Sequence, residues 1–145
     1  MTRSRATSLA LAVAVAHLAC GKMDMCGNQV LSRVAFPGGG HQAVIFERDC
    51  GATTGFSTQV SVLPGDSTFQ EQPSFWNGTE QGNVLVIDDD HGAAPAGTGG
   101  GPEVAARWDD EQHLDLTYHP RARVFRANLG IGTVVVQHRK STDLK

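Results

Sequence analysis

The chain has 145 residues, a hydrophobic content of 40% and a formal net charge of −3. This length accommodates one domain with a modest core and excludes two independent domains. Its 17 glycines exceed the usual share of about 7% of residues, so we expect many turns and few helices.

Charge is unevenly distributed along the chain. Thirteen acidic residues lie between Glu47 and Asp115, against only Arg48 and Arg107, whereas the segment from His119 onward is basic. We expect the two regions to neutralise each other across one folded surface. A nucleic-acid partner is not expected for an exported protein with this charge pattern.

Residues 1–19 have the layout of a secretory signal peptide. Arg3 and Arg5 precede an apolar run from Ala6 to Ala16, with no acidic residue before it. A positive start followed by a short apolar segment is typical of export signals. The run is about half of the roughly 20 residues that a membrane-spanning helix needs, so we do not expect a permanent transmembrane anchor.

Two processing sites compete after this segment. The sequence HLAC, which ends at Cys20, resembles the lipobox of bacterial lipoproteins, although two of its residues depart from the usual ones. The alternative is cleavage after Ala16, which would release a soluble periplasmic or secreted protein. Lipid on Cys20 leaves Cys26 and Cys50 as an even pair, whereas the alternative leaves an odd thiol in an oxidising compartment. We therefore predict a periplasm-facing lipoprotein of the bacterial cell envelope.

A first hairpin is predicted around the glycine-rich turn at residues 37–40. Residues 30–36 and 43–49 on either side are rich in apolar and β-branched residues, a pattern typical of paired strands. Cys26 and Cys50 lie equally far from the centre of this turn, so antiparallel pairing places them opposite each other, within bridging distance. A disulfide between them is therefore predicted.

The alternative role for Cys50 is that of a nucleophilic thiolate. Such a thiolate needs nearby positive charge or a base. Glu47 and Asp49 are close neighbours of Cys50 in the sequence, and Arg48 alone opposes them. The sequence therefore favours the disulfide over the nucleophile.

Several later segments have strand-like patterns. Residues 56–62 alternate between apolar and polar, which predicts a strand with one solvent-facing side. Residues 83–88 are mostly apolar and are expected to form a central strand covered on both faces. Residues 104–118 indicate a second hairpin, and 123–127 and 131–138 complete a count of about eight strands.

The second hairpin turns near Asp110. The apolar positions of its first strand, Val104, Ala106 and Trp108, are matched across the turn by those of its second, Leu114, Leu116 and Tyr118. Because nothing after residue 20 has a convincing helical period, we predict an all-β fold, a single small antiparallel sandwich or partly open barrel. The predicted organisation is a signal peptide at 1–19, a tether at 20–27, the all-β domain at 28–140 and a tail at 141–145.

An acidic cluster follows the strand at 83–88. Its candidate ligand or metal-binding residues are Asp88, Asp90 and His91, because adjacent carboxylates repel each other and a divalent cation such as calcium would relieve that repulsion. Strand alternation directs Asp89 away from the other two. The simpler interpretation is a solvated strand end in which an aspartate caps a turn.

Two further pairs of residues are candidates for a contact surface. Phe75 and Trp76 lie in a polar connection, where they form either an exposed patch or a plug at one end of the core. Arg121 and Arg123 are expected on one strand face, where they could bind a carboxylate or phosphate. The alternative is that they pair with acids of the same sheet, such as Asp109 or Asp115.

The segments ERDCGATTGFST, DDDHGAAPAG and YHPRARVF carry a resemblance to a family of small uncharacterised exported proteins of proteobacteria. The resemblance covers about residues 26–126 and is most specific at ERDCGATTGFST. It implies an exported or membrane-linked bacterial domain. It implies no activity, substrate or catalytic residue.

Two functions from different classes follow from these patterns. The first is a lipid-anchored domain that binds an envelope protein or a cell-wall component without catalysis and without a cofactor. The alternative is a metal-assisted hydrolase that uses Asp88, Asp90 and His91 with calcium or another divalent metal.

Overall fold

The computed structural model describes residues 26–51, 54–72 and 81–144. In these residues the chain forms nine β-strands and no helix, against the predicted count of about eight. The strands are β1 (Gly27–Ala35), β2 (His41–Asp49), β3 (Ser57–Pro64), β4 (Leu85–Asp88), β5 (Val104–Asp110), β6 (His113–Tyr118), β7 (Arg123–Ala127), β8 (Gly130–Ile131) and β9 (Val134–Lys140).

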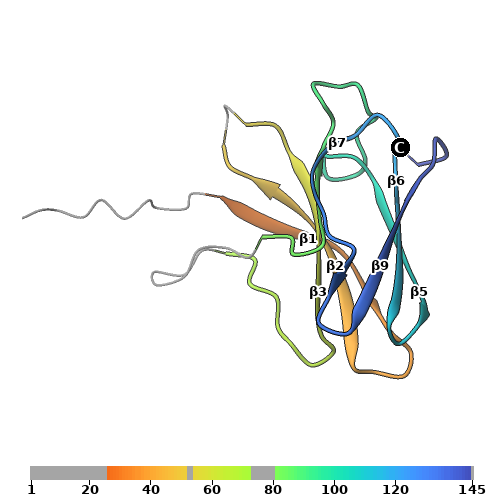
Figure 1. The fold of residues 1–145 in the computed structure, drawn as a ribbon. Helices are drawn as coiled ribbons and strands as arrows, with labels where there is room; N and C mark the ends of the chain where they lie inside the picture. Colours follow the sequence, from red (N-terminus) through yellow and green to blue (C-terminus); the bar gives the residue numbers. More distant parts are fainter. Residues whose placement is uncertain (1–25, 52–53, 73–80, 145) are drawn as a thin grey trace, which may run out of the picture.

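The strands form two sheets with the core between them. The first sheet has five strands in the order β1-β2-β3-β4-β7, and the second has four in the order β5-β6-β9-β8. In Figure 1, β1, β2 and β3 lie on one side of the molecule and β5, β6 and β9 on the other. This arrangement confirms the predicted all-β sandwich, and within the described residues neither sheet closes into a barrel.

The prediction of a purely antiparallel fold is wrong for one strand pair. β6 and β9 run parallel, with Leu114 opposite Val136. Between these strands the chain crosses to the first sheet to form β7 and returns through β8. Parallel strands cannot be joined by a tight turn, so no local pattern in the sequence reveals this pair.

Both predicted hairpins are confirmed. β1 and β2 are joined by a turn in which Gly39 and Gly40 have positive φ angles of 81° and 85°, a conformation that glycine adopts at little cost. In the second hairpin, Trp108 lies opposite Leu114. The period of two in each segment sets which side chains face the core, and that in turn sets the register.

β2 is covered on both faces. Ile45 on its inner face belongs to the main core, and Phe69 lies over its outer face, with the Phe46 and Phe69 ring centroids 4.5 Å apart. The strand predicted at residues 83–88 does lie inside its sheet, since β4 is between β3 and β7, but its outer face is not fully covered, because Val86 is only partly buried.

The outer face of β3 is also covered. The sequence predicts that this side of residues 56–62 faces solvent, but Gln59 and Ser61 are buried. The Gly82 N–H donates to Gln59 Oε1 at 2.7 Å, and Ser61 Oγ donates to the Gln81 carbonyl at 3.2 Å. The chain that leads into β4 therefore covers this polar face and provides its side chains with hydrogen-bond partners. The prediction that this face is exposed to solvent is wrong.

Three edge strands of the sheets each contain a β-bulge. The extra residues are Leu31 in β1, Asp109 in β5 and Phe125 in β7. Bulges interrupt the regular row of donors and acceptors and so hinder pairing between the edges of two molecules.

Between β1 and β5, Trp108 joins the two sheets, since its Nε1 donates to the Val34 carbonyl at 2.8 Å.

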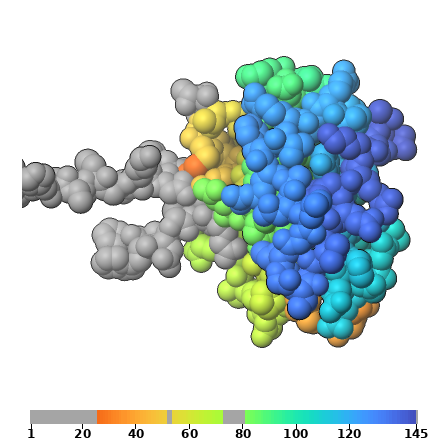
Figure 2. All heavy atoms as spheres, in the orientation of Figure 1, coloured from red at the N-terminus to blue at the C-terminus, as the bar shows by residue number. Residues whose placement is uncertain are grey.

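Among the described residues, the segment from β7 to β9 supplies the most exposed large apolar side chains. Phe125 is 61% exposed and Leu129 is 74% exposed. In Figure 2, the blue segments from this part of the chain make up much of the visible face. The guanidinium of Arg123 lies 5.0 Å from the centre of the Phe125 ring, so charge and apolar surface are interleaved here.

Candidate functional site

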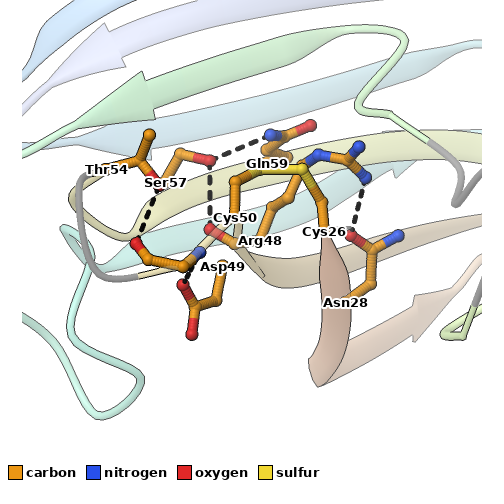
Figure 3. The surroundings of a disulfide bond; sticks show 9 residues. Cys26, Asn28, Arg48, Asp49, Cys50, Thr54, Ser57 and Gln59 are labelled. Carbon is orange, nitrogen blue, oxygen red and sulfur yellow. Dashed lines mark hydrogen bonds between the residues drawn. A yellow bond between two sulfur atoms is a disulfide. The ribbon is translucent and has the colours of Figure 1, made fainter. Parts of the chain in front are cut away.

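Cys26 and Cys50 form a disulfide at the open end of the first hairpin, as predicted (Figure 3). Strand pairing brings them together. Gly27 lies opposite Asp49. Cys26, just before Gly27, and Cys50, just after Asp49, are therefore neighbours across the two antiparallel strands. Because its sulfur is bonded, Cys50 is not available as a nucleophile in this state.

Hydrogen bonds order the chain around the disulfide (Figure 3). Arg48 Nη1 donates to Asn28 Oδ1 at 3.1 Å across β1 and β2. The Gly51 N–H donates to Asp49 Oδ1 at 2.8 Å, and Thr54 Oγ1 donates to the Gly51 carbonyl at 3.1 Å. Asp49 is thereby held at the end of β2, where its carboxylate also faces the surface.

The predicted cluster of Asp88, Asp90 and His91 lies at the end of β4 and converges on Arg123. Arg123 Nε donates to Asp88 Oδ1 at 3.1 Å, and its Nη2 pairs with Oδ2. Its Nη1 lies 3.6 Å from Asp90 Oδ1 and 3.5 Å from His91 Nε2. The guanidinium of the protein itself therefore supplies the positive charge that the sequence interpretation assigns to a metal ion.

A left-handed turn brings these side chains to one side. Asp90 and His91 have φ angles of 50° and 58°, and Gly92 follows with 86°. Such angles are uncommon for residues other than glycine. The Asp90 N–H donates to Asp88 Oδ1 at 2.9 Å, so Asp88 caps this turn, as the simpler interpretation of the cluster expects.

Arg123 also determines the ionisation of Asp88. Burial raises the pKa of this carboxyl, but the hydrogen bonds from Arg123 and from the Asp90 N–H, together with the charges of Arg123 and His91, outweigh burial and hold the pKa below its ordinary value of 3.8. Within the described part of the chain, no three His, Cys, Asp or Glu side chains are grouped so that they could hold a metal ion. The metal site stays a prediction.

Arg121 and Arg123 do not share a strand face, which corrects the prediction. β7 begins at Arg123, and Arg121 lies in the exposed turn before it. Arg123 pairs with an acid of its own sheet, Asp88, as the alternative expects, but Asp109 and Asp115 pair with a different arginine, Arg107, at 2.8 and 2.9 Å. The sequence could not distinguish these partners, because they depend on which strands become neighbours.

Three predicted site residues lie outside the described part of the chain. They are Cys20, the predicted lipidation site, and Phe75 and Trp76, the predicted contact residues. Their roles stay predictions.

Glu47 is a candidate residue that the sequence interpretation missed. It continues the inner face of β2 after Ala43 and Ile45, which belong to the core. Glu47 is only 5% exposed. The two-residue alternation of this strand places Glu47 on the inner face, but a charged residue type does not by itself predict burial.

A glycine-rich loop covers Glu47. The Gly101 N–H donates to Glu47 Oε2 at 3.4 Å, and a Cβ atom on Gly99 would clash with the same oxygen. A Cβ on Gly100 would lie 2.7 Å from the Phe56 ring. Glycines at these positions therefore allow the backbone to lie directly on the side chains at the end of the first sheet.

Burial of Glu47 disfavours its charged form. Desolvation raises the pKa of this carboxyl, the hydrogen bond from Gly101 opposes the rise, and the negative charge of Asp49 adds to it, so that the pKa lies above the ordinary value of 4.5. Asp88 is half-buried and paired with an arginine, and its pKa shifts in the other direction. The two pKa values shift in opposite directions because Asp88 has a positive partner, Arg123, whereas no positive group contributes to the shift of Glu47.

An open pocket of about 510 Å³ lies at this end of the first sheet. Glu47 and Gln29, which are paired across β1 and β2, line it together with Asp49 and Phe56. No Lys, Arg or His is among the described residues that line it. The pocket is therefore acidic and lies next to the disulfide.

No helix in the described part of the chain is long and apolar enough to cross a membrane. A scan against protein-family models found no match, and searches of curated proteins and of solved structures found none either.

Proposed function

We propose that the chain is an exported, lipid-anchored module of the bacterial envelope that binds a partner without catalysis. The Cys26–Cys50 disulfide is the observation that carries this proposal. Disulfides persist in oxidising compartments and are rare in the cytosol. With these two cysteines bonded to each other, Cys20 is the remaining one, and it ends the lipobox-like sequence.

The surroundings of the candidate groups favour binding over catalysis. Cys50 is bonded to Cys26, and the carboxylate of Asp88 is paired with Arg123. Among the sites discussed, the pocket at Glu47 is the one that is open and lined by two carboxylates with no Lys, Arg or His among its described lining residues. Ligand-recognition sites are typically concave, with polar groups placed so that they fix the orientation of the ligand.

The predicted anchor would hold this pocket near the membrane. β1 begins at Gly27, seven residues after Cys20. Seven residues of extended chain span at most about 25 Å. A partner of the pocket would therefore be met close to the membrane surface.

The mass of the mature N-terminus tests the anchor. Protein isolated from membranes is expected to begin at Cys20 and to carry acyl chains, and Cys20→Ser is expected to move the protein out of the membrane fraction. A Cys26→Ser/Cys50→Ser variant should keep its lipid and serves as the control. An unmodified chain that starts at His17 would contradict the proposal.

Thermal melts separate the binding module from the alternative hydrolase. Ligands that bind only the folded state raise the melting temperature. We expect the same melting temperature in EDTA and in millimolar calcium, because Arg123 already neutralises Asp88. A rise with calcium that disappears in Asp90→Asn would favour the metal site instead.

A further inference from the structure

Strand pairing builds one acidic face beyond the end of the core. Gln29 lies opposite Glu47, and Gly27 lies opposite Asp49. Because side chains alternate along a strand, Glu47 and Asp49 lie on the same face of β2 as the core residue Ile45. Two carboxylates two residues apart on one strand therefore face the same pocket.

Among the residues that the structure describes, no positive side chain pairs with Glu47, whereas the other strongly buried acid has two such partners. Asp115 is 4% exposed and is paired with two arginines, Arg107 and Arg139. Glu47 is 5% exposed, and among the described residues its carboxylate receives one long hydrogen bond, from the Gly101 N–H at 3.4 Å to Oε2. Oε1 receives none among those residues and belongs to a side chain that lines the pocket.

We propose that this pocket binds the basic side chain of a protein partner, a lysine ammonium or an arginine guanidinium. The inference rests on the proposed function as a binding module and names what the module recognises. The cation donates hydrogen bonds to Glu47 and Asp49, which face it from one strand. Charge-assisted hydrogen bonds of this kind are about twice as strong as neutral ones.

The ring of Phe56 forms part of the same site. Phe56 lines the pocket and is 43% exposed, so part of its ring is available to a ligand. A cation over an aromatic ring gains about 0.5–1 kcal/mol at exposed sites. An organic cation uses such a ring together with carboxylates, and its alkyl stem contacts the ring edge.

Two other cations fit the pocket less well. Calcium takes six to eight oxygen ligands, and no group of three acidic, histidine or cysteine side chains suited to a metal occurs among the described residues. An ethanolamine headgroup carries a phosphate beside its ammonium, and no described basic side chain lines the pocket to receive that phosphate. A lysine or arginine side chain carries a positive charge without an accompanying phosphate, so it fits the described lining better than the headgroup does.

The test is an NMR titration of the isotope-labelled, oxidised protein isolated in its processed form. The probes are N-acetyl-lysine methylamide and N-acetyl-arginine methylamide, with N-acetyl-norleucine methylamide as the uncharged control. We expect shifts at the amides of Gln29, Glu47 and Gly101, with a Kd on the order of 1 mM that rises with added salt. Equal shifts with norleucine, or none with lysine and arginine, would overturn the proposal.

Variants identify the groups that recognise the charge. Glu47→Gln keeps the shape of the side chain and is expected to weaken binding about tenfold or more, a loss of about 1.4 kcal/mol. Asp49→Asn is expected to weaken it less. Asp66→Asn removes the same charge from an exposed site outside the pocket and should bind as the unaltered protein does. Unchanged affinity in Glu47→Gln, with an otherwise unaltered spectrum, would refute the assignment.

A further arm distinguishes the source of the cation. O-phosphoethanolamine, the soluble counterpart of the headgroup, is expected to bind more weakly than the lysine compound, and tighter binding would replace the protein partner with a lipid. These titrations report on the pocket alone. The mass of the N-terminus reports on the anchor, so the two proposals fail separately.

Discussion

Buried carboxylates of this protein differ in whether a cation accompanies them. Burial tends to raise the pKa of Asp115, but hydrogen bonds and charge from Arg139 and Arg107 outweigh it, and the pKa lies below 3.8. Glu47 is buried to the same degree, but its pKa is raised. Asp115 therefore stabilises the fold when ionised, whereas the ionisation of Glu47 costs stability.

Replacing Asp115 should reveal this contribution through its pH dependence. A lowered pKa stabilises the folded state above the unfolded value of 3.8, and this stability is lost as the pH falls below it. We expect Asp115→Asn to lower the free energy of unfolding at pH 7 by about 1–2 kcal/mol, a range reduced because both arginines are largely exposed. Urea denaturation at pH 7 and pH 3 measures the difference, which should shrink at the lower pH.

Asp109 offers a matched control for that comparison. It pairs with the same Arg107 at 2.8 Å, but both side chains are exposed, at 37% and 71%. Exposed ion pairs contribute about 0–1 kcal/mol, so Asp109→Asn should have little effect at either pH. An equal loss in both variants, or a loss in Asp115→Asn that does not change with pH, would contradict this account.

At the scale of elements, local features were predictable and distant ones were not. The register of both hairpins follows from the two-residue alternation and from turns of a few residues, so Cys26 and Cys50 could be paired from the sequence. The position of β9 beside β6, and of Phe69 over β2, depends on contacts far apart in the chain. For the same reason the partner of Arg123 was missed.

The glycine-rich loop between β4 and β5 is a second element whose role only the structure reveals. In the sequence, residues 97–101 match no phosphate-binding motif. In the fold they lie against Glu47, Phe56 and Thr58 at distances that leave no room for a Cβ atom. These glycines serve close packing, and the candidate pocket depends on it because the loop covers Glu47.

Substitution of this loop is expected to be costly at one glycine. A Cβ on Gly101 would lie 2.5 Å from Thr58 Oγ1 and 3.0 Å from the Thr58 backbone nitrogen. We expect Gly101→Ala to lower the free energy of unfolding by about 1–3 kcal/mol through overpacking. Gly55→Ala, where nothing lies within 4 Å, is the control and should be neutral or slightly stabilising. Chemical denaturation measures both, and equal stabilities would argue against close packing of the loop.

For the whole molecule, the disulfide adds a constraint to a domain with a modest core. Cys26 and Cys50 are 24 residues apart in sequence. In the chain-entropy model, closing a loop of this size contributes about 3 kcal/mol. That is a large share of the total stability of about 5–15 kcal/mol that is typical of folded proteins.

Removal of the disulfide should therefore destabilise the entire domain. The Cys26→Ser/Cys50→Ser variant is expected to lose about 3 kcal/mol in urea denaturation. A reductant should produce a similar loss in the unaltered protein and no further loss in the variant, which serves as the control for side effects of the reductant. Unaltered protein that is insensitive to reductant would show that its cysteines were already free.

The parallel pairing of β9 has a consequence for biogenesis. β9 lies between β6 and β8, and its Val134 and Val136 are 2% and 1% exposed in the main core. The second sheet thus lacks an interior strand until residue 140 has left the ribosome. A chain that cannot complete its core during synthesis stays unfolded until it is released, and the export proposed above would require an unfolded chain.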